Sequence, residues 1–172
     1  TPPDGLPAHA YFEAVGAVVW THVDPHEQAD TTILSAAHER LAAQPFEGQR
    51  AALTEIAWRR SETWMDQLRG DAPHGQRLLA SINAASQVLP PPADDALRFA
   101  LGRRWALDLA RWGAPRAFEL PTSPVPGPGF LEGMAHGLGT QWGPEASLDT
   151  WWPAATPPSH AVRRAYWAGV EE

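Results

Sequence analysis

The chain has 172 residues, of which 44% are hydrophobic and 19% charged, and its formal net charge is −7. This length and composition exclude wholesale disorder and a fibrous repeat, and they suffice for a buried core. The absence of Cys and Lys excludes disulfides, thiolate metal sites, lysine Schiff bases and a P-loop lysine. The acidic balance argues against nucleic acid as a partner, and no apolar run approaches the roughly 20 residues of a membrane-spanning helix.

Apolar residues at helical spacing predict an all-α fold with about five helices. The predicted helices cover residues 8–22, 24–44, 45–69, 73–89 and 94–112. Proline, glycine and N-cap residues predict breaks near 23–24, 44–46, 70–73 and 89–94. The stripes predicted to face inward include Tyr11, Val15, Val18 and Val19, then Ile33, Ala37 and Leu41, then Leu53, Ile56, Trp64 and Leu68, and finally Leu97, Leu101 and Trp105.

The character of the sequence changes after Gly113, where proline and glycine become frequent. The same segment is rich in tryptophan and other aromatics, which a disordered tail would lack. We therefore predict one domain, with a helical core over residues 1–113 and a long, ordered but irregular C-terminal arm over residues 114–172 that packs on it. Short helices are expected near residues 130–138 and 159–168.

The densest group of metal-ligand residue types lies where the first predicted helix meets the second. The candidate metal ligands are His22, His26, Asp30 and His38. The favoured interpretation is structural, because Asp24 and Glu27 suit the N-cap and first turn of a helix. A metal or proton-transfer site is the alternative. No cofactor is predicted apart from a divalent metal at this junction.

A glycine-rich stretch surrounds His136, with Gly129, Gly133 and Gly137 at a spacing of four residues. Close helix packing is the favoured interpretation, and a mobile lid with His136 facing a pocket is the alternative. The tryptophans of the arm, together with His136, are the second candidate site, a surface for a ligand or partner. These tryptophans are Trp142, Trp151, Trp152 and Trp167.

Most arginines have acidic neighbours at helical spacing, and we interpret them as parts of solvated helix faces and ion pairs. Arg103 and Arg104 differ, because they lie in the helix that we expect to be most buried, and a buried Arg needs a partner. Asp108 is the nearest candidate for Arg104, while Glu171 and Glu172 read as a solvated terminus.

The sequence offers few residues arranged for nucleophilic catalysis. It therefore favours a non-catalytic helical module that binds a protein partner or an apolar small molecule. The alternative is a metal- or His-dependent, hydrolase-like enzyme at the junction of the first two helices. Whether the chain is an enzyme, and its oligomeric state, are left open by the sequence. No signal peptide is visible, so a cytoplasmic location is the default, with a cleaved signal peptide as the alternative.

Overall fold

The computed structural model describes residues 2–3, 5–22, 32–70, 83–84, 86–111, 127–145, 148–152 and 157–172. Within these ranges the regular elements are helices and no strand occurs, which confirms the all-α prediction. None of the helices described there is both long and apolar enough to cross a membrane. The chain forms two compact units, Thr1–Leu97 and Arg98–Glu172, which we call the N-terminal and C-terminal units. The predicted boundary at residues 113–114 lies outside the described ranges and stays a prediction.

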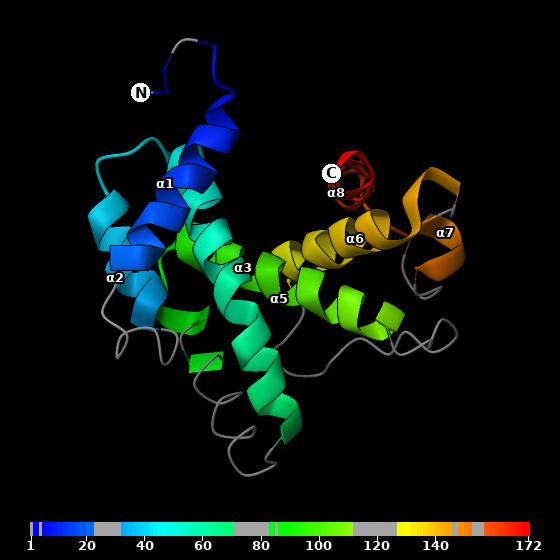
Figure 1. The fold of residues 1–172 in the computed structure, drawn as a ribbon. Helices are drawn as coiled ribbons and strands as arrows, with labels where there is room; N and C mark the ends of the chain where they lie inside the picture. The colour runs from blue at the N-terminus through cyan, green and yellow to red at the C-terminus, as the bar shows by residue number, and fades with distance from the viewer. Residues whose placement is uncertain are drawn as a thin grey trace. The chain divides into compact units, whose positions relative to one another are not determined.

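In the N-terminal unit, helices α1 (Ala8–His22) and α2 (Thr32–Leu41) both pack against α3 (Phe46–Gly70), as Figure 1 shows. The contact of α1 with α3 is unusually close, since a Cβ atom on Gly16 would lie 2.4 Å from the carbonyl oxygen of Ala52. This approach turns the Phe12 and Gly16 face of α1 toward α3. Val18, which the sequence predicted to face inward, is 58% exposed, so that assignment was wrong.

The predicted stripes of α2 and α3 are confirmed where the structure describes them. The buried residues on the two helices include Ile33, Ala37, Leu41, Leu53 and Ile56. The predicted side chains of Trp64 and Leu68 lie outside the described set. The observed α3 is displaced by one residue from the prediction of 45–69, and the carbonyl oxygen of Pro45, just before it, accepts from the N–H of Gln49. Helix α2 ends at Leu41, three residues before the predicted end at 44, and its predicted start at residue 24 lies outside the described residues.

Helix α5 (Pro91–Arg111) begins three residues earlier than predicted. Proline is tolerated in the first turn of a helix, where its missing N–H has no helical partner. The carbonyl oxygen of Pro90 accepts from the N–H groups of Ala93 and Asp94, and this closes the first turn. Within the N-terminal unit, Arg50 of α3 pairs with the start of α5, where its Nε lies 2.5 Å from an oxygen of Asp95.

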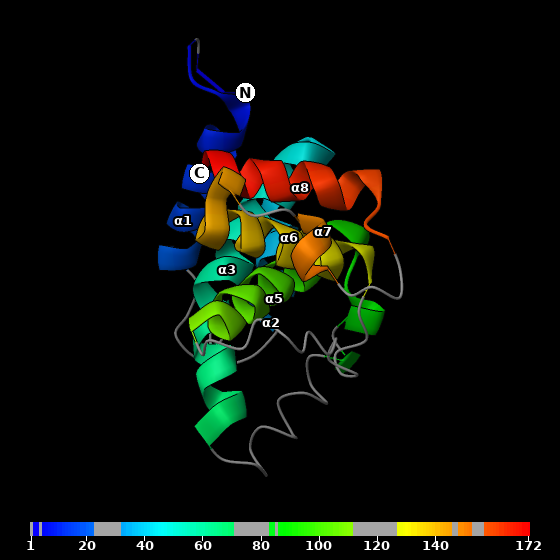
Figure 2. The same ribbon diagram turned by 90° about the vertical axis from the view of Figure 1, so that its right-hand side faces the viewer.

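The C-terminal unit contains residues 98–111 of α5 and the elements that follow. These are α6 (Pro128–Trp142), the 3-10 helix η2 (Gly143–Glu145), α7 (Leu148–Trp151) and α8 (His160–Glu171). Helix α6 packs against α8, and Figure 2 shows the two crossing. Both helices are longer than the predicted 130–138 and 159–168, so the described part of the arm is more helical than expected.

Many of the aromatic and apolar residues that the structure describes in the C-terminal unit are buried. The buried set includes Phe130, Met134, Leu138, Leu148, Trp152, Val162 and Tyr166. Tyr166 also donates a hydrogen bond of 2.8 Å from its hydroxyl to the carbonyl oxygen of Gly143. Ser159 caps α8, because its Oγ accepts from the N–H of Val162 at 3.2 Å. The first contact joins α8 to the segment after α6, and the second closes the first turn of α8.

Candidate functional site

Glycines bring α5 and α6 of the C-terminal unit into backbone contact. A Cβ atom on Gly133 would lie 2.0 Å from the carbonyl oxygen of Phe99, and one on Gly102 would lie 2.0 Å from that of Phe130. Gly137 lies against the carbonyl oxygen of Arg103, with a Cβ distance of 2.7 Å. No larger residue fits at such separations. The predicted close packing by Gly133 and Gly137 is thus confirmed.

Glycines also bring the backbones of α6 and α8 into contact. A Cβ atom on Gly139 would lie 2.1 Å from the carbonyl oxygen of Tyr166, and one on Gly169 would lie 2.0 Å from that of His136. Glycines on both helices therefore remove the side chains that would separate them. The consequence is that Glu172, one residue beyond α8, lies beside the middle of α6 and α5.

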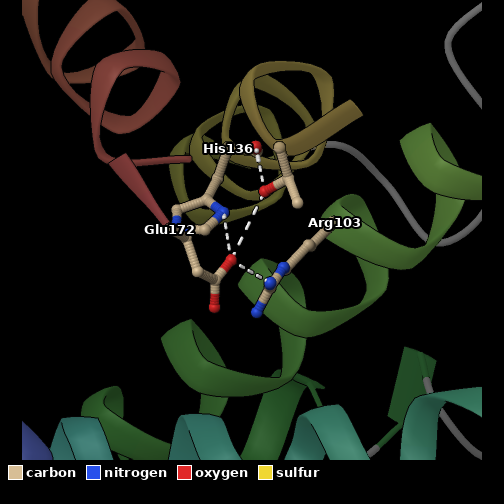
Figure 3. A network of polar contacts seen from close by, with 4 residues as sticks. Arg103, His136 and Glu172 are labelled. Atoms are coloured by element: carbon tan, nitrogen blue, oxygen red, sulfur yellow. Dashed lines mark hydrogen bonds and ion pairs between the residues drawn. The ribbon is translucent and has the colours of Figure 1, made fainter. Parts of the chain in front are cut away.

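A polar cluster forms where the three helices meet, as Figure 3 shows. The Nη2 atom of Arg103 donates to Oε2 of Glu172, and the Thr140 hydroxyl lies 3.4 Å from the same oxygen. His136 Nδ1 lies 4.0 Å from it, which is longer than a hydrogen bond. The single hydroxyl proton of Thr140 can go either to this oxygen or to the carbonyl oxygen of His136, which is 3.1 Å away. We call Arg103, His136, Thr140 and Glu172 the polar cluster.

The side chains of the polar cluster differ in burial. Those of Arg103 and His136 are each 15% exposed, whereas that of Glu172 is 49% exposed. The cationic group is thus largely enclosed by the unit, and the carboxylate reaches it from the solvent side. A largely buried guanidinium requires an anionic or hydrogen-bonding partner, and Glu172 supplies one.

His136 is held neutral in this environment. Burial of the ring, reinforced by the charge of Arg103, lowers its pKa from 6.5 to about 4, although Glu172 opposes the shift. The ring packs edge-on against Phe99, with centroids 5.4 Å apart. Nδ1 is buried and makes no hydrogen bond. A neutral imidazole with an unused ring nitrogen is therefore aimed at the carboxylate of Glu172.

The predicted metal site falls mostly outside the described residues. His26 and Asp30 lie in the segment 23–31, and His22 is the last residue of α1 but its side chain is not described. His38 lies on α2, partly exposed, with a buried Nδ1 that has no hydrogen-bond partner. Among the residues that the structure describes, no three His, Asp or Glu side chains gather as metal ligands would. The metal site stays a prediction.

The predicted tryptophan surface is described in part. Trp167 is 53% exposed on α8, whereas Trp152 is 8% exposed and packs inside the C-terminal unit. Trp142 ends α6 and is partly exposed, and the side chain of Trp151 is not described. Of the predicted surface, Trp167 and Trp142 are thus the members that reach solvent among the described side chains. The ring of Trp167 packs edge-on against Tyr166 at 5.6 Å.

His136 was predicted to share a surface with the arm tryptophans, whereas its side chain is 15% exposed and lies in the polar cluster. Arg103 and Glu172 are 69 positions apart, and no local spacing relates them. Glu172 was expected to be a solvated terminus, whereas its carboxylate accepts from Arg103. Arg104 is 7% exposed, which confirms that this helix carries a buried Arg, while the side chain of its predicted partner Asp108 is not described. The one signal in the sequence was the placement of Arg103 in a helix expected to be buried.

No family model, curated protein or solved structure matches this chain.

Proposed function

We propose that this chain is a non-catalytic helical module that binds a protein partner through the solvent-facing side of α8. The observation that carries the proposal is Trp167, which is 53% exposed. The other side of the same helix faces the protein interior, since Val162 and Tyr166 are buried there. Tryptophan and arginine dominate the binding energy of protein interfaces. Arg164 is exposed one helical turn before Trp167.

The exposed positions of α8 lie on one face at helical spacing. They are His160, Arg163, Arg164, Trp167, Ala168 and Glu171, which we call the outer face of α8. Arg163 is already engaged, because its guanidinium donates to both carboxylate oxygens of Asp149 at 3.1 and 2.8 Å. Arg164 thus faces solvent beside an exposed indole, and it suits a partner that presents a carboxylate next to an apolar pocket.

The test is site-specific photocrosslinking of the full chain in extract of the source cells. A benzophenone amino acid replaces Trp167 in one sample and Val88, which is 82% exposed in the N-terminal unit, in the matched control. The proposal expects one partner crosslinked from position 167 and not from 88. Arg164→Ala should weaken that crosslink at least fivefold while leaving the circular dichroism spectrum unchanged. The same proteins captured from both positions, or none from 167, would refute it.

A metal- or His-dependent enzyme at the junction of α1 and α2 remains the second candidate. It is favoured by His38, whose buried Nδ1 lacks a hydrogen-bond partner and would gain one as a metal ligand. The measurement is the metal content of untagged protein. Stoichiometric zinc, manganese or iron that is lost in His38→Ala would support it, and metal-free protein would end it.

A further inference from the structure

The polar cluster has the form of a receptor with a carboxylate already bound in it. Arg103 comes from α5, while His136 and Thr140 come from α6, one helical turn apart. Their polar atoms converge on a single oxygen, Oε2 of Glu172, at the positions drawn in Figure 3. A guanidinium, a hydroxyl whose single proton can turn toward the carboxylate, and an imidazole in the tautomer that carries its proton on Nδ1 together make a donor set that fits a carboxylate.

The receptor side of this arrangement is rigid. The α5 and α6 backbones contact each other at Gly102, Gly133 and Gly137, so Arg103 and His136 are held on two helices that cannot slide apart without losing that packing. Their side chains are also mostly enclosed. Preorganised groups of this kind bind a ligand without the cost of ordering them.

The ligand side is readily displaced. Glu172 follows Glu171, the last helical residue of α8, and its side chain is half exposed. Removing its carboxylate from the cluster requires rotation of one side chain, while Gly169 still holds α8 against α6. The carboxylate end of this ion pair is half exposed, so an external anion can reach Arg103 once Glu172 rotates away, although it must compete with a carboxylate that the chain itself holds nearby.

The internal carboxylate leaves part of the receptor unused. Each hydrogen bond and ion pair of Glu172 among the described residues goes to Oε2. His136 Nδ1, 4.0 Å away and buried, makes no hydrogen bond. A carboxylate that enters from solvent is not tethered to α8, so it can place one oxygen on Arg103 and the other within reach of His136.

We propose that Arg103, His136 and Thr140 form a carboxylate-binding site that Glu172 fills in the free chain and that an external carboxylate enters by displacing it. The ligand is the carboxylate of a small organic acid or of an acidic side chain on another protein. This site is separate from the outer face of α8 and does not depend on the proposed function.

The experiment empties the site and refills it with acetate. Glu172→Ala removes the internal carboxylate, and Glu171→Ala is the matched control, because it removes the same charge from an exposed neighbour. We expect 100 mM sodium acetate, compared with 100 mM sodium chloride, to raise the Tm of Glu172→Ala by about 3 °C with a saturable dose dependence. Wild type and Glu171→Ala should need at least fivefold more acetate for the same shift.

A second set of variants shows whether the proposed residues bind the acetate. Arg103→Gln in the Glu172→Ala background should abolish the shift. If that protein does not fold, Thr140→Val keeps the test decisive, because Thr140 is exposed and its loss should weaken acetate binding severalfold in NMR titrations. An equal acetate effect in Glu172→Ala and Glu171→Ala, or an effect that survives loss of the Arg103 or Thr140 donors, would overturn the proposal.

Two probes then distinguish the source of the carboxylate. Acetate represents a small acid, and an acetylated tripeptide with a central Glu represents a protein side chain, with the Gln peptide as its control. A Glu peptide that binds Glu172→Ala at least tenfold more tightly than acetate assigns the site to an acidic protein segment. Equal affinity assigns it to small carboxylates.

Discussion

Gly169 of α8 lies against the backbone of His136 in α6, so closely that a Cβ atom on Gly169 would lie 2.0 Å from the His136 carbonyl oxygen. In an ordinary helix, Gly→Ala stabilises by about 1 kcal/mol, because alanine has the higher helix propensity. At this contact we expect the opposite sign, with Gly169→Ala lowering the free energy of unfolding by about 2 kcal/mol or more. Urea denaturation measures the difference.

Ala168, the exposed neighbour on the same helix, provides the control. Ala168→Gly should cost about 1 kcal/mol from propensity alone. A stabilising Gly169→Ala would show that α8 does not touch α6 at this point.

The second prediction concerns acid stability. The pKa of His136 is lowered from 6.5 to about 4 by burial and by Arg103. Below pH 6.5 the imidazole of His136 is therefore protonated in the unfolded chain but stays neutral in the folded chain. Because the unfolded state binds the extra proton, the free energy of unfolding falls as the pH drops toward 4. This group should contribute a loss of about 2 kcal/mol between pH 7 and pH 4.5.

His136→Gln isolates this contribution, because glutamine keeps a polar side chain but does not titrate. The difference between the unfolding free energies of wild type and His136→Gln should shrink as the pH falls from 7 to 4.5. A difference that is constant over this range would show that the His136 ring titrates normally in the folded protein.

The third prediction tests the hydroxyl of Tyr166. Its side chain is 2% exposed, and its O–H donates to the carbonyl oxygen of Gly143 at 2.8 Å. Tyr166→Phe keeps the ring but leaves that carbonyl without this donor, so it should cost about 1 kcal/mol in thermal or urea unfolding. Burial raises the pKa of Tyr166, so wild type should also lose stability above pH 10 as the unfolded phenol ionises first, and Tyr166→Phe should lose less.

The fourth prediction tests the N-cap of α8. Ser159 Oγ accepts from the N–H of Val162, so Ser159→Ala should lower the free energy of unfolding by about 1 kcal/mol. Ser159→Asp retains an acceptor and adds a charge that suits a helix N-terminus, so it should preserve stability. If Ser159→Ala unfolds at the same urea concentration as wild type, the cap contributes nothing.

The helices of the N-terminal unit were largely predictable, because their apolar positions repeat locally. Ile33, Ala37 and Leu41 follow the helical period and are buried, and Pro45 and Gly70 mark the boundaries of α3. Val18 obeyed the same pattern yet is exposed. Its orientation depends on Gly16, which contacts a backbone that the local sequence does not reveal.

The candidate sites were likewise predictable only where they depend on residues that are close in sequence. The glycine spacing around His136 predicted close packing from the sequence, because a small residue every fourth position lines one face of a helix. The partner of Arg103 was not predictable, since Glu172 reaches it only after α8 folds back across α6. The predicted junction of His22, His26, Asp30 and His38 lies largely beyond the described residues, and it stays a prediction.

The sequence by itself determined the helical class, the bounds of α1 and α3 to within one residue, and the small-residue face of α6, because each depends on residues within a few turns of one another. Only the tertiary structure decided the orientation of α1, the burial of Trp152 against the exposure of Trp167, and the meeting of Arg103, His136, Thr140 and Glu172. The physical reason is that backbone contacts between distant helices, at Gly16, Gly133, Gly139 and Gly169, set how the helices rotate. That rotation determines which side chains face one another.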